Sequence, residues 1–323
     1  MAGVTTFDTY KSVGIREDLL DVIEDISPTD TPFVSNVGSG SSKGTFHEWQ
    51  KDSLAAPSDT PVAEGADAVP ASLTPTIRLG NYTQINEKSY IISGSDLKAD
   101  NAGRGVEMAY QEAKKGLEIR KDVEFAIVGT NKARNAGAAN DPGAAAARES
   151  ASVLSWIATN TSATAGDGVA DTTAPTGDGT DARTDGIQRT FTESMLESVV
   201  DQCYLSGANP GVIMTNTVQK RVISGSFLGR ATAVDATVEA KKVVNAVDFY
   251  ESDYGIMSIV PNRYMRQREV FVLDTAQWSV DYYRPYFSHE LAKTGDNEKR
   301  QMVVEWTLRS GEEAGSGIVA DLS

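Results

Sequence analysis

Hydrophobic residues recur at helical spacing most clearly from Gly105 to Val128. The apolar positions there lie three or four residues apart, and the opposite face is charged. This pattern predicts one helix about 36 Å long at 1.5 Å per residue. The charged face predicts the ion pairs Glu112–Lys115 and Glu118–Lys121. The apolar positions that define the pattern are Val106, Ala109, Tyr110, Ala113, Leu117, Val123, Ala126 and Ile127.

An extended segment precedes that helix. Residues 74–93 alternate β-branched and aromatic residues with polar ones, which predicts two strands broken near Gly80 and Asn81. Together with residues 44–50 they are expected to form a long two-stranded projection. Residues 38–69 are rich in Gly, Ser, Pro, Asp and Ala. Because ordering a backbone residue costs about 1–2 kcal/mol, such a segment indicates a subunit stabilised by identical copies around it.

The N-terminal region has a different pattern. Residues 10–34 predict one short amphipathic helix, ended by Pro28 and Pro32, with a polar arm ahead of it. Residues 130–189 are dominated by Ala, Gly, Thr, Asp and Asn, which predicts a surface insertion or partly mobile loop.

The second half of the chain has hydrophobic patterns typical of a compact fold. Residues 191–205 predict an amphipathic helix, 212–214 a short buried strand, and Asn216 the cap of a further helix. The tail 311–323 is polar and is expected to be loosely held. The predicted class is α+β. Further strands are expected at 247–250, 256–260, 270–273, 278–282 and 302–308.

Composition narrows the function classes. The chain has 323 residues and a formal net charge of −15, which argues against nucleic-acid binding, because that affinity rests on Lys and Arg. One cysteine and two histidines exclude an intramolecular disulfide and leave too few ligands for an ordinary structural zinc site. No run approaches the roughly 20 apolar residues of a membrane span, and no signal segment is apparent. We expect no cofactor and no membrane partner.

Two stretches resemble ligand sites only superficially. Residues 38–45 resemble a phosphate-binding loop, but Lys43 precedes its glycine and no apolar strand leads in, so a flexible loop base is favoured. A group of aspartates could ligate calcium or magnesium, but it lacks the closing glutamate of an EF-hand, so a solvated acidic loop is favoured. That group comprises Asp167, Asp171, Asp178, Asp181 and Asp185.

Other reactive side chains have structural interpretations. Cys203 lies on the apolar side of a predicted helix and is expected to be a small buried residue. His47 and His289 belong to no arrangement with Ser or Cys and Asp, so a loop residue and an edge-strand residue are favoured. An aromatic group is expected in the core or at a subunit interface rather than in a ligand site. Its members are Trp278, Tyr282, Tyr283, Tyr286 and Phe287.

Four phrases stand out along the chain: TYKSVGIREDLLDVIEDISPTDTPFVSNVG, FHEWQKDSL, VDFYESDYGIMSIVPNRYM and VFVLD. These phrases and the order of elements resemble the major capsid proteins of tailed bacteriophages, whose fold is shared with herpesviruses, and within them a podovirus-associated family. The resemblance covers nearly the whole chain outside residues 131–189 and includes no catalytic signature.

The resemblance implies a domain organisation. Six parts are expected: an N-terminal arm (1–40), an extended loop with flanking strands (41–95), the spine helix of a peripheral domain (96–130), an Ala/Gly/Asp-rich insertion (131–189), an axial domain (190–262), and return strands with the tail (263–323).

It also implies a mechanical function. Copies of the chain would form pentamers and hexamers that close into an icosahedral head shell around packaged double-stranded DNA, with no enzymatic activity. The chain would assemble in the host bacterial cytoplasm and end in the virion. Portal, scaffold and decoration proteins are the expected partners besides the chain itself. Some members of the fold crosslink through a Lys and an Asn, but no residue here matches that chemistry.

The intersubunit contact candidates lie in the arm and the loop. Phe46 and Trp49 are expected to anchor the loop. The arm is expected to bury Leu19, Leu20, Val22 and Ile23 and to offer Arg16, Glu17 and Asp18 for ion pairs between subunits. Two alternatives stay open: another self-assembling protein, such as an encapsulin-like shell or a surface layer, and a soluble ligand-binding protein or enzyme. A stable monomer whose melting responds to a ligand would favour the last.

Overall fold

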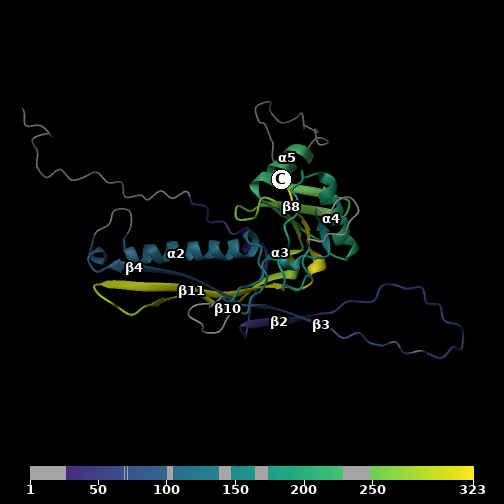
Figure 1. The fold of residues 1–323 in the computed structure, drawn as a ribbon, viewed down its shortest axis with the longest axis horizontal. Coiled ribbons are helices and arrows are strands. Elements are labelled where there is room, and N and C mark those ends of the chain that lie inside the picture. The colour runs from purple at the N-terminus through teal and green to yellow at the C-terminus, as the bar shows by residue number, and fades with distance from the viewer. Residues whose placement is uncertain are drawn as a thin grey trace, which may run out of the picture.

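The computed structural model describes residues 27–68, 70, 72–99, 105–137, 147–163, 174–227 and 248–323. Figure 1 shows an elongated part made of one long helix over long strands, a globular part built on a second sheet, and an extended loop that projects away from both. Helices and strands are mixed along the chain, as the α+β prediction requires. None of the helices in the described ranges is long and apolar enough to cross a membrane.

The elongated part rests on a four-stranded sheet with the order β1-β10-β11-β4. β10 and β11 pair antiparallel, β4 pairs antiparallel with β11, and β1 runs parallel to β10. β10 and β11 extend well beyond the predicted 278–282 and 302–308, because ladder hydrogen bonds continue through polar residues that lack an apolar alternation. The strands are β1 (Gly38–Ser41), β4 (Gln84–Ser93), β10 (Trp278–Glu290) and β11 (Asn297–Ser310).

Helix α2 (Glu107–Glu124) lies along this sheet and continues as one π-helical turn, Phe125–Gly129 (Figure 1). The predicted long helix is confirmed. Polar contacts help to attach it to the strands. Glu112 accepts a hydrogen bond from Ser288 Oγ at 2.6 Å and pairs with Arg300 at 2.9 Å.

The rotation of α2 differs from the simple expectation that the apolar stripe faces the core. The first part of the stripe is exposed, with Val106 and Leu117 65% and 44% exposed, whereas its later members Val123 and Ile127 are fully buried as predicted. Ile119, which the predicted stripe did not include, is fully buried as well. The polar pairs with the strands decide this rotation. The two predicted ion pairs along the helix are also wrong, since Glu112 pairs with Arg300 and Lys115 with Glu118.

The globular part is built on a six-stranded sheet with the order β5-β12-β9-β6-β8-β7. Helix α4 lies against β5 and β12, and α5 packs near β8. Asn216 caps α5 as predicted, with its side chain accepting from Val218 N. The elements are α4 (Glu193–Leu205), α5 (Thr217–Ser226), β5 (Asn160–Ser162), β6 (Val212–Thr215), β7 (Phe249–Ser252), β8 (Gly255–Pro261), β9 (Val270–Leu273) and β12 (Gly317–Val319).

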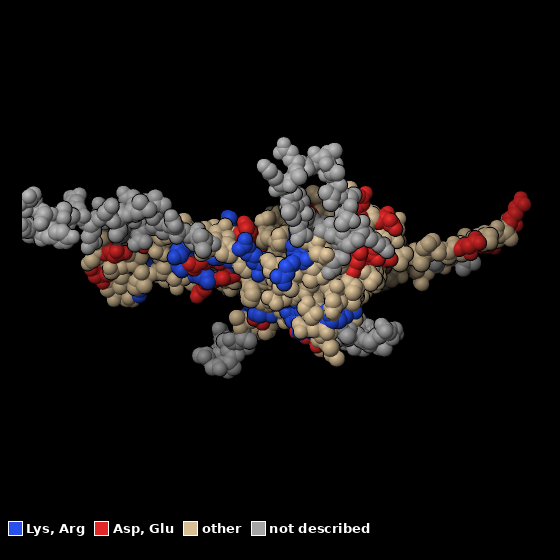
Figure 2. Space-filling model, turned by 90° about the horizontal axis from the view of Figure 1, so that it is seen from above, with Lys and Arg blue, Asp and Glu red and all other residues tan. Residues whose placement is uncertain are grey.

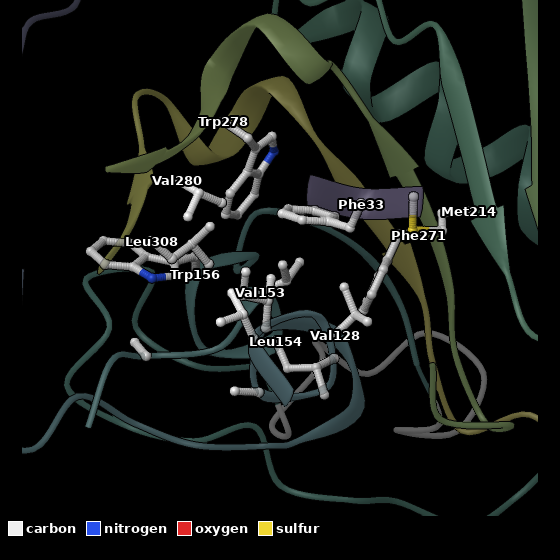
Figure 3. Close-up of a cluster of buried hydrophobic side chains, with 14 of the residues drawn as sticks. Phe33, Val128, Val153, Leu154, Trp156, Met214, Phe271, Trp278, Val280 and Leu308 are labelled. Carbon is white, nitrogen blue, oxygen red and sulfur yellow. The ribbon is translucent and has the colours of Figure 1, made fainter. Parts of the chain in front are cut away.

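A core of buried side chains joins the two sheets (Figure 3). Phe33 and Trp278 meet edge to face with ring centroids 6.2 Å apart. Trp156 and Leu308 belong to the same cluster, so segments from all regions of the chain meet there. A second cluster, which includes Phe191 and the α4 side chains, fills the other side of the six-stranded sheet.

The expectation of a surface insertion at 131–189 is wrong for its described middle. Val153–Trp156 forms the short helix α3, and all four of its side chains are buried. The few apolar residues of this segment are adjacent, and together they reach the core. Flanking residues are held by backbone bonds, such as Arg134 N to Gly179 O at 2.7 Å.

The expectation of a loosely held tail is also wrong. β12 pairs with β5 and β9 inside the sheet, and Ile318 and Val319 are fully buried. Polar residues in the tail have partners within the subunit. Arg268, for example, pairs with Asp321 at 2.8 Å.

Two further expectations need correction. Helix α1 (Pro32–Asn36) begins at Pro32 rather than ending there, because proline fits the first turn of a helix; the rest of the predicted 10–34 helix lies mainly outside the described residues. The two-stranded projection is short. It contains β2 (Phe46–Lys51) and β3 (Ile77–Tyr82), while β4 joins the larger sheet.

Candidate assembly surfaces

The extended loop, residues 52–76, is the most exposed part of the described chain. It leaves the molecule between β2 and β3 and turns back far from both sheets (Figure 1). Each of its described residues is exposed. The exposed fractions of Leu54, Val62 and Leu73 are 99%, 75% and 96%. The subunit itself therefore provides no apolar surface that covers these three side chains.

Both predicted loop anchors lie at the base of this loop. Trp49 is 8% exposed, and its ring centroid lies 5.4 Å from that of Trp156. Phe46 is half-buried, 4.6 Å from the ring of Tyr82, with the Arg134 guanidinium 5.5 Å from its ring. They pack within their own subunit, and whether a neighbouring subunit also contacts them stays a prediction.

Charged contacts fix the same base to the body of the subunit. Lys51 pairs with Glu312 at 2.9 Å, and His47 Nε2 lies 2.9 Å from Asp281 Oδ2 on β10. His47 is therefore a strand residue rather than the expected loop residue. The direction in which the loop leaves the subunit is set by these contacts and by the β2–β3 ladder.

The root of the arm is held by a buried carboxylate. Glu124 accepts hydrogen bonds from Phe33 N at 2.7 Å, Val34 N at 2.9 Å and Asn262 Nδ2 at 2.6 Å. Burial raises the pKa of Glu124, and these three donors oppose that rise. One side chain thus joins α1, the end of α2 and the residue after β8. The predicted arm contacts Arg16, Glu17, Asp18, Leu19, Leu20, Val22 and Ile23 lie outside the described residues.

A hollow between α4 and β7 has an acidic wall that the sequence analysis did not single out. Burial and nearby carboxylates, Glu197 the strongest of them, raise the pKa of Tyr250 to about 12, so its hydroxyl stays protonated. Acidic side chains gather on the globular part in Figure 2. The four-residue spacing of three α4 carboxylates was the available signal. The wall comprises Glu193, Glu197, Asp201, Glu251 and Asp253.

The groups considered for ligand chemistry have structural roles in the described residues. Cys203 is buried, and burial raises the pKa of its thiol to about 12. Asp181 accepts from Thr176 N at 3.0 Å, and Asp178 from Thr180 N at 2.9 Å. No group of metal-ligating side chains occurs where the structure describes the chain. Asp167 and Asp171 lie outside that part.

The remaining motifs also serve the fold. In the stretch that resembles a phosphate loop, residues 38–41 form strand β1. His289 lies on β10 with its ring 5.7 Å from that of Phe287. Of the aromatic group, Trp278 is buried in the core and Tyr283 is 40% exposed. The prediction of a core or interface role is confirmed for Trp278.

The comparison with known sequences matches the whole chain. The sequence profile of the SU10 major capsid protein family matches residues 2–323. The major capsid protein of Escherichia phage Phieco32 is 28% identical over 347 residues, covering 99% of this chain and 97% of that protein.

Solved structures show the same fold at low sequence identity. The capsid asymmetric unit of cyanophage A-1(L) has a TM-score of 0.66 at 12% identity, and the capsid of a native GTA particle has 0.65 at 9% identity; each comparison covers 98% of both chains. The major capsid proteins of phage G, solved with decoration proteins, have a TM-score of 0.55 at 12% identity, with 96% of both chains covered. The predicted tailed-phage capsid fold is confirmed, and the chain belongs to the SU10 major capsid protein family.

Proposed function

We propose that this chain assembles as pentamers and hexamers into the icosahedral head shell of a tailed bacteriophage, enclosing packaged double-stranded DNA. The extended loop supports this proposal most strongly. Ordering its 25 residues, 52–76, would cost about 1–2 kcal/mol each, and none of the described ones is buried in the subunit. A neighbouring copy can supply the missing contacts, since apolar side chains this exposed mark interaction sites.

The parts of the fold take separate roles in this proposal. The axial domain, 190–262, lies around the fivefold and sixfold axes, and the peripheral domain with α2 spans the space between them. The loop covers an adjacent subunit. The arm, 1–40, reaches adjacent subunits through Arg16, Glu17 and Asp18, while Phe46 and Trp49 hold the loop base in position.

The charge of the chain fits a container for DNA. With a net charge of −15, the inner surface would release DNA easily during packaging and ejection, because tight binding needs neutralising Lys and Arg. We infer that the protein has no catalytic activity. The structural roles of Cys203, His47 and the described aspartates support this inference.

A major capsid protein is a component of the virion. We propose that the shell assembles in the host bacterial cytoplasm. A portal protein and a scaffold are the proposed partners, because a closed shell needs an opening for DNA and a guide for its curvature. Decoration proteins are further candidate partners, since the major capsid proteins of phage G were solved together with decoration proteins.

Electron microscopy of the chain expressed alone and with a candidate portal and scaffold tests this function. We expect closed shells, sheets or rings, and a size-exclusion mass far above that of the subunit. A stable monomer or dimer under every condition would contradict the proposal. Shells that close without a portal and take up a specific cargo enzyme would instead indicate an encapsulin-like compartment.

A further inference from the structure

Helix α2 carries an exposed apolar stripe on the side turned away from its buried face. Val106 and Leu117 are 65% and 44% exposed, and Ala109 and Ala113 between them are exposed as well. Small side chains allow another helix to approach closely, at the 8–10 Å between axes seen in packed helices. Within α2 the stripe runs from Ala109 to Leu117, about 14 Å of helix, and Val106 immediately precedes the helix.

The strands beneath α2 add a second wall to this stripe. Tyr286 from β10 and Met302 from β11 line an open groove with Ala113, Gly116 and Leu117. The Arg120 guanidinium lies 5.8 Å from the centre of the Tyr286 ring and forms one end of the groove. The floor and walls are thus mainly apolar. Glu112 also lines the groove, but it is paired with Arg300 at 2.9 Å.

The arm has the complementary pattern. Ile15, Leu19, Val22, Ile23 and Ile26 recur at three- and four-residue spacing, so a helix over residues 15–26 would carry one apolar face. Twelve residues of helix span about 18 Å, which is long enough to cover the stripe.

Charge favours the same pairing. Residues 15–26 carry five carboxylates and one arginine. Lys114 and Arg120 flank Leu117 three residues to either side, so they lie on opposite rims of the stripe. Both are exposed, and neither takes part in an ion pair among the described residues. An acidic amphipathic helix in the groove would place its carboxylates beside these two cations.

The arm begins close enough to reach this groove in its own subunit. Glu124, at the end of α2, binds the backbone of α1, and Tyr264 donates to the Pro28 carbonyl at 3.2 Å. In Figure 1 the purple N-terminal segment lies above the C-terminal half of α2. Leu117 lies seven residues before Glu124, or about 10 Å along the helix. Pro28 is held beside Tyr264, and the two residues from there to Ile26 span at most about 7 Å.

We propose that residues 15–26 pack as an amphipathic helix into the groove between α2 and strands β10 and β11 of their own subunit. Leu19 and Ile23 face the groove, with the helix parallel to α2. Arg16 and Glu17 then point outward, where a neighbouring subunit can meet them. Only that outward contact rests on the proposed shell function. The docking itself takes place in a single subunit.

A pair of introduced cysteines tests the docking. In the double variant Leu19→Cys with Ala113→Cys, we expect a short bismaleimide to join the two residues within one chain, identified by mass spectrometry of the linked peptides. The native Cys203 is buried and stays inert, as the wild-type protein would show. The pair Glu17→Cys with Ala113→Cys is the matched control, because residue 17 lies on the opposite face of the arm helix.

Two results would overturn this proposal. The absence of a 19–113 product would show that the groove does not hold the arm. A product that joins two chains, including one formed on mixing the two single-cysteine variants, would show that the groove holds the arm of a neighbour. Both experiments work on unassembled subunits as well as on particles, so their failure leaves the shell function untouched.

Proteolysis gives an independent test. Leu117→Asp removes an apolar wall and repels the acidic arm, and we expect trypsin to cleave after Arg16 at least about tenfold faster. The matched control is Leu205→Asp on α4, since Leu205 is 84% exposed and lies away from the groove. Equal cleavage rates in wild type and Leu117→Asp would contradict the docking.

Discussion

The extended loop and the C-terminal tail have similar compositions but opposite environments. Both are rich in Ala, Ser and Asp or Glu, and both have few large apolar residues. Every described residue of 52–76 is exposed, whereas most residues of 311–323 are buried. Composition alone therefore does not tell which polar segment belongs to the subunit and which waits for a neighbour.

The difference lies in backbone partners. The tail places β12 between β5 and β9, and Glu313 accepts hydrogen bonds from Ala158 N and Thr159 N, both at 3.1 Å. The loop has only local contacts of this kind, such as Ala66 N to Ala63 O. A polar segment whose backbone groups have hydrogen-bond partners within the subunit is part of its fold. A segment whose backbone groups lack such partners is available to another chain.

Trp156→Ala should give the largest loss of stability in this comparison. Trp156 is fully buried and packs against Trp49 below the loop base, so we expect a loss of about 3–5 kcal/mol. Urea unfolding followed by circular dichroism measures it. Trp156→Phe should lose much less. An unchanged midpoint for Trp156→Ala would show that segment 151–160 is not part of the core.

Ile318→Ala should follow, with a loss of about 2–5 kcal/mol, because its side chain is fully buried in the six-stranded sheet. The matched control is Leu54→Ala in the loop, where the side chain is 99% exposed and the change should stay within about 0.5 kcal/mol. Similar losses for both variants in unassembled protein would remove the contrast between tail and loop.

The sequence predicted what depends on local pattern. The long helix, the cap at Asn216 and the strand at 270–273 follow from spacing and capping rules, and the structure confirms them. The rotation of α2 does not follow from these rules, because it depends on Glu112 contacting Ser288 and Arg300, which lie more than 170 positions away in the sequence.

The candidate surfaces also differ in how far the sequence predicted them. An exposed loop around 52–76 was foreseeable from its composition. The burial of Trp156 and Ile318 was not, since short apolar runs inside polar segments carry no periodic signal. The acidic wall of α4 and β7 joins residues 193 to 253, which only the sheet order brings together.

Protonation should act on the six-stranded sheet that holds the tail and leave the loop unchanged. Burial raises the pKa of Glu269 to about 7, from about 4.3 in the unfolded chain. Between these values the folded state holds the extra proton, so its stability declines as pH rises from about 4.5 through 7.

Glu269→Gln should remove the decline in unfolding free energy between about pH 4.5 and pH 7, which amounts to roughly 2–4 kcal/mol. The side chain is 1% exposed and contacts Arg266 at 3.0 Å, just before β9, the partner of β12. Melting temperatures from pH 5 to pH 8 measure the effect. The same pH dependence in variant and wild type would exclude Glu269 as its cause.

The smallest effect on stability should come from the loop side chains. In the triple variant Leu54→Ser, Val62→Ser, Leu73→Ser we expect the melting temperature of the unassembled subunit to stay unchanged and the yield of particles to fall. The matched control replaces the loop carboxylates Asp59, Glu64 and Asp67 with serine. Equal particle yields from both triple variants would show that the apolar side chains are not what a neighbour contacts.

Replacing the loop by a short turn shows whether assembly needs it. Lys51 and Ile77 are paired in the β2–β3 ladder, so an Asn-Gly turn can replace residues 52–76 without disturbing either strand. The melting temperature and electron micrographs of this variant should be compared with those of the full chain. We predict a folded subunit of unchanged melting temperature that forms no closed shells. Normal shells would contradict the account, because the loop would then be dispensable for assembly.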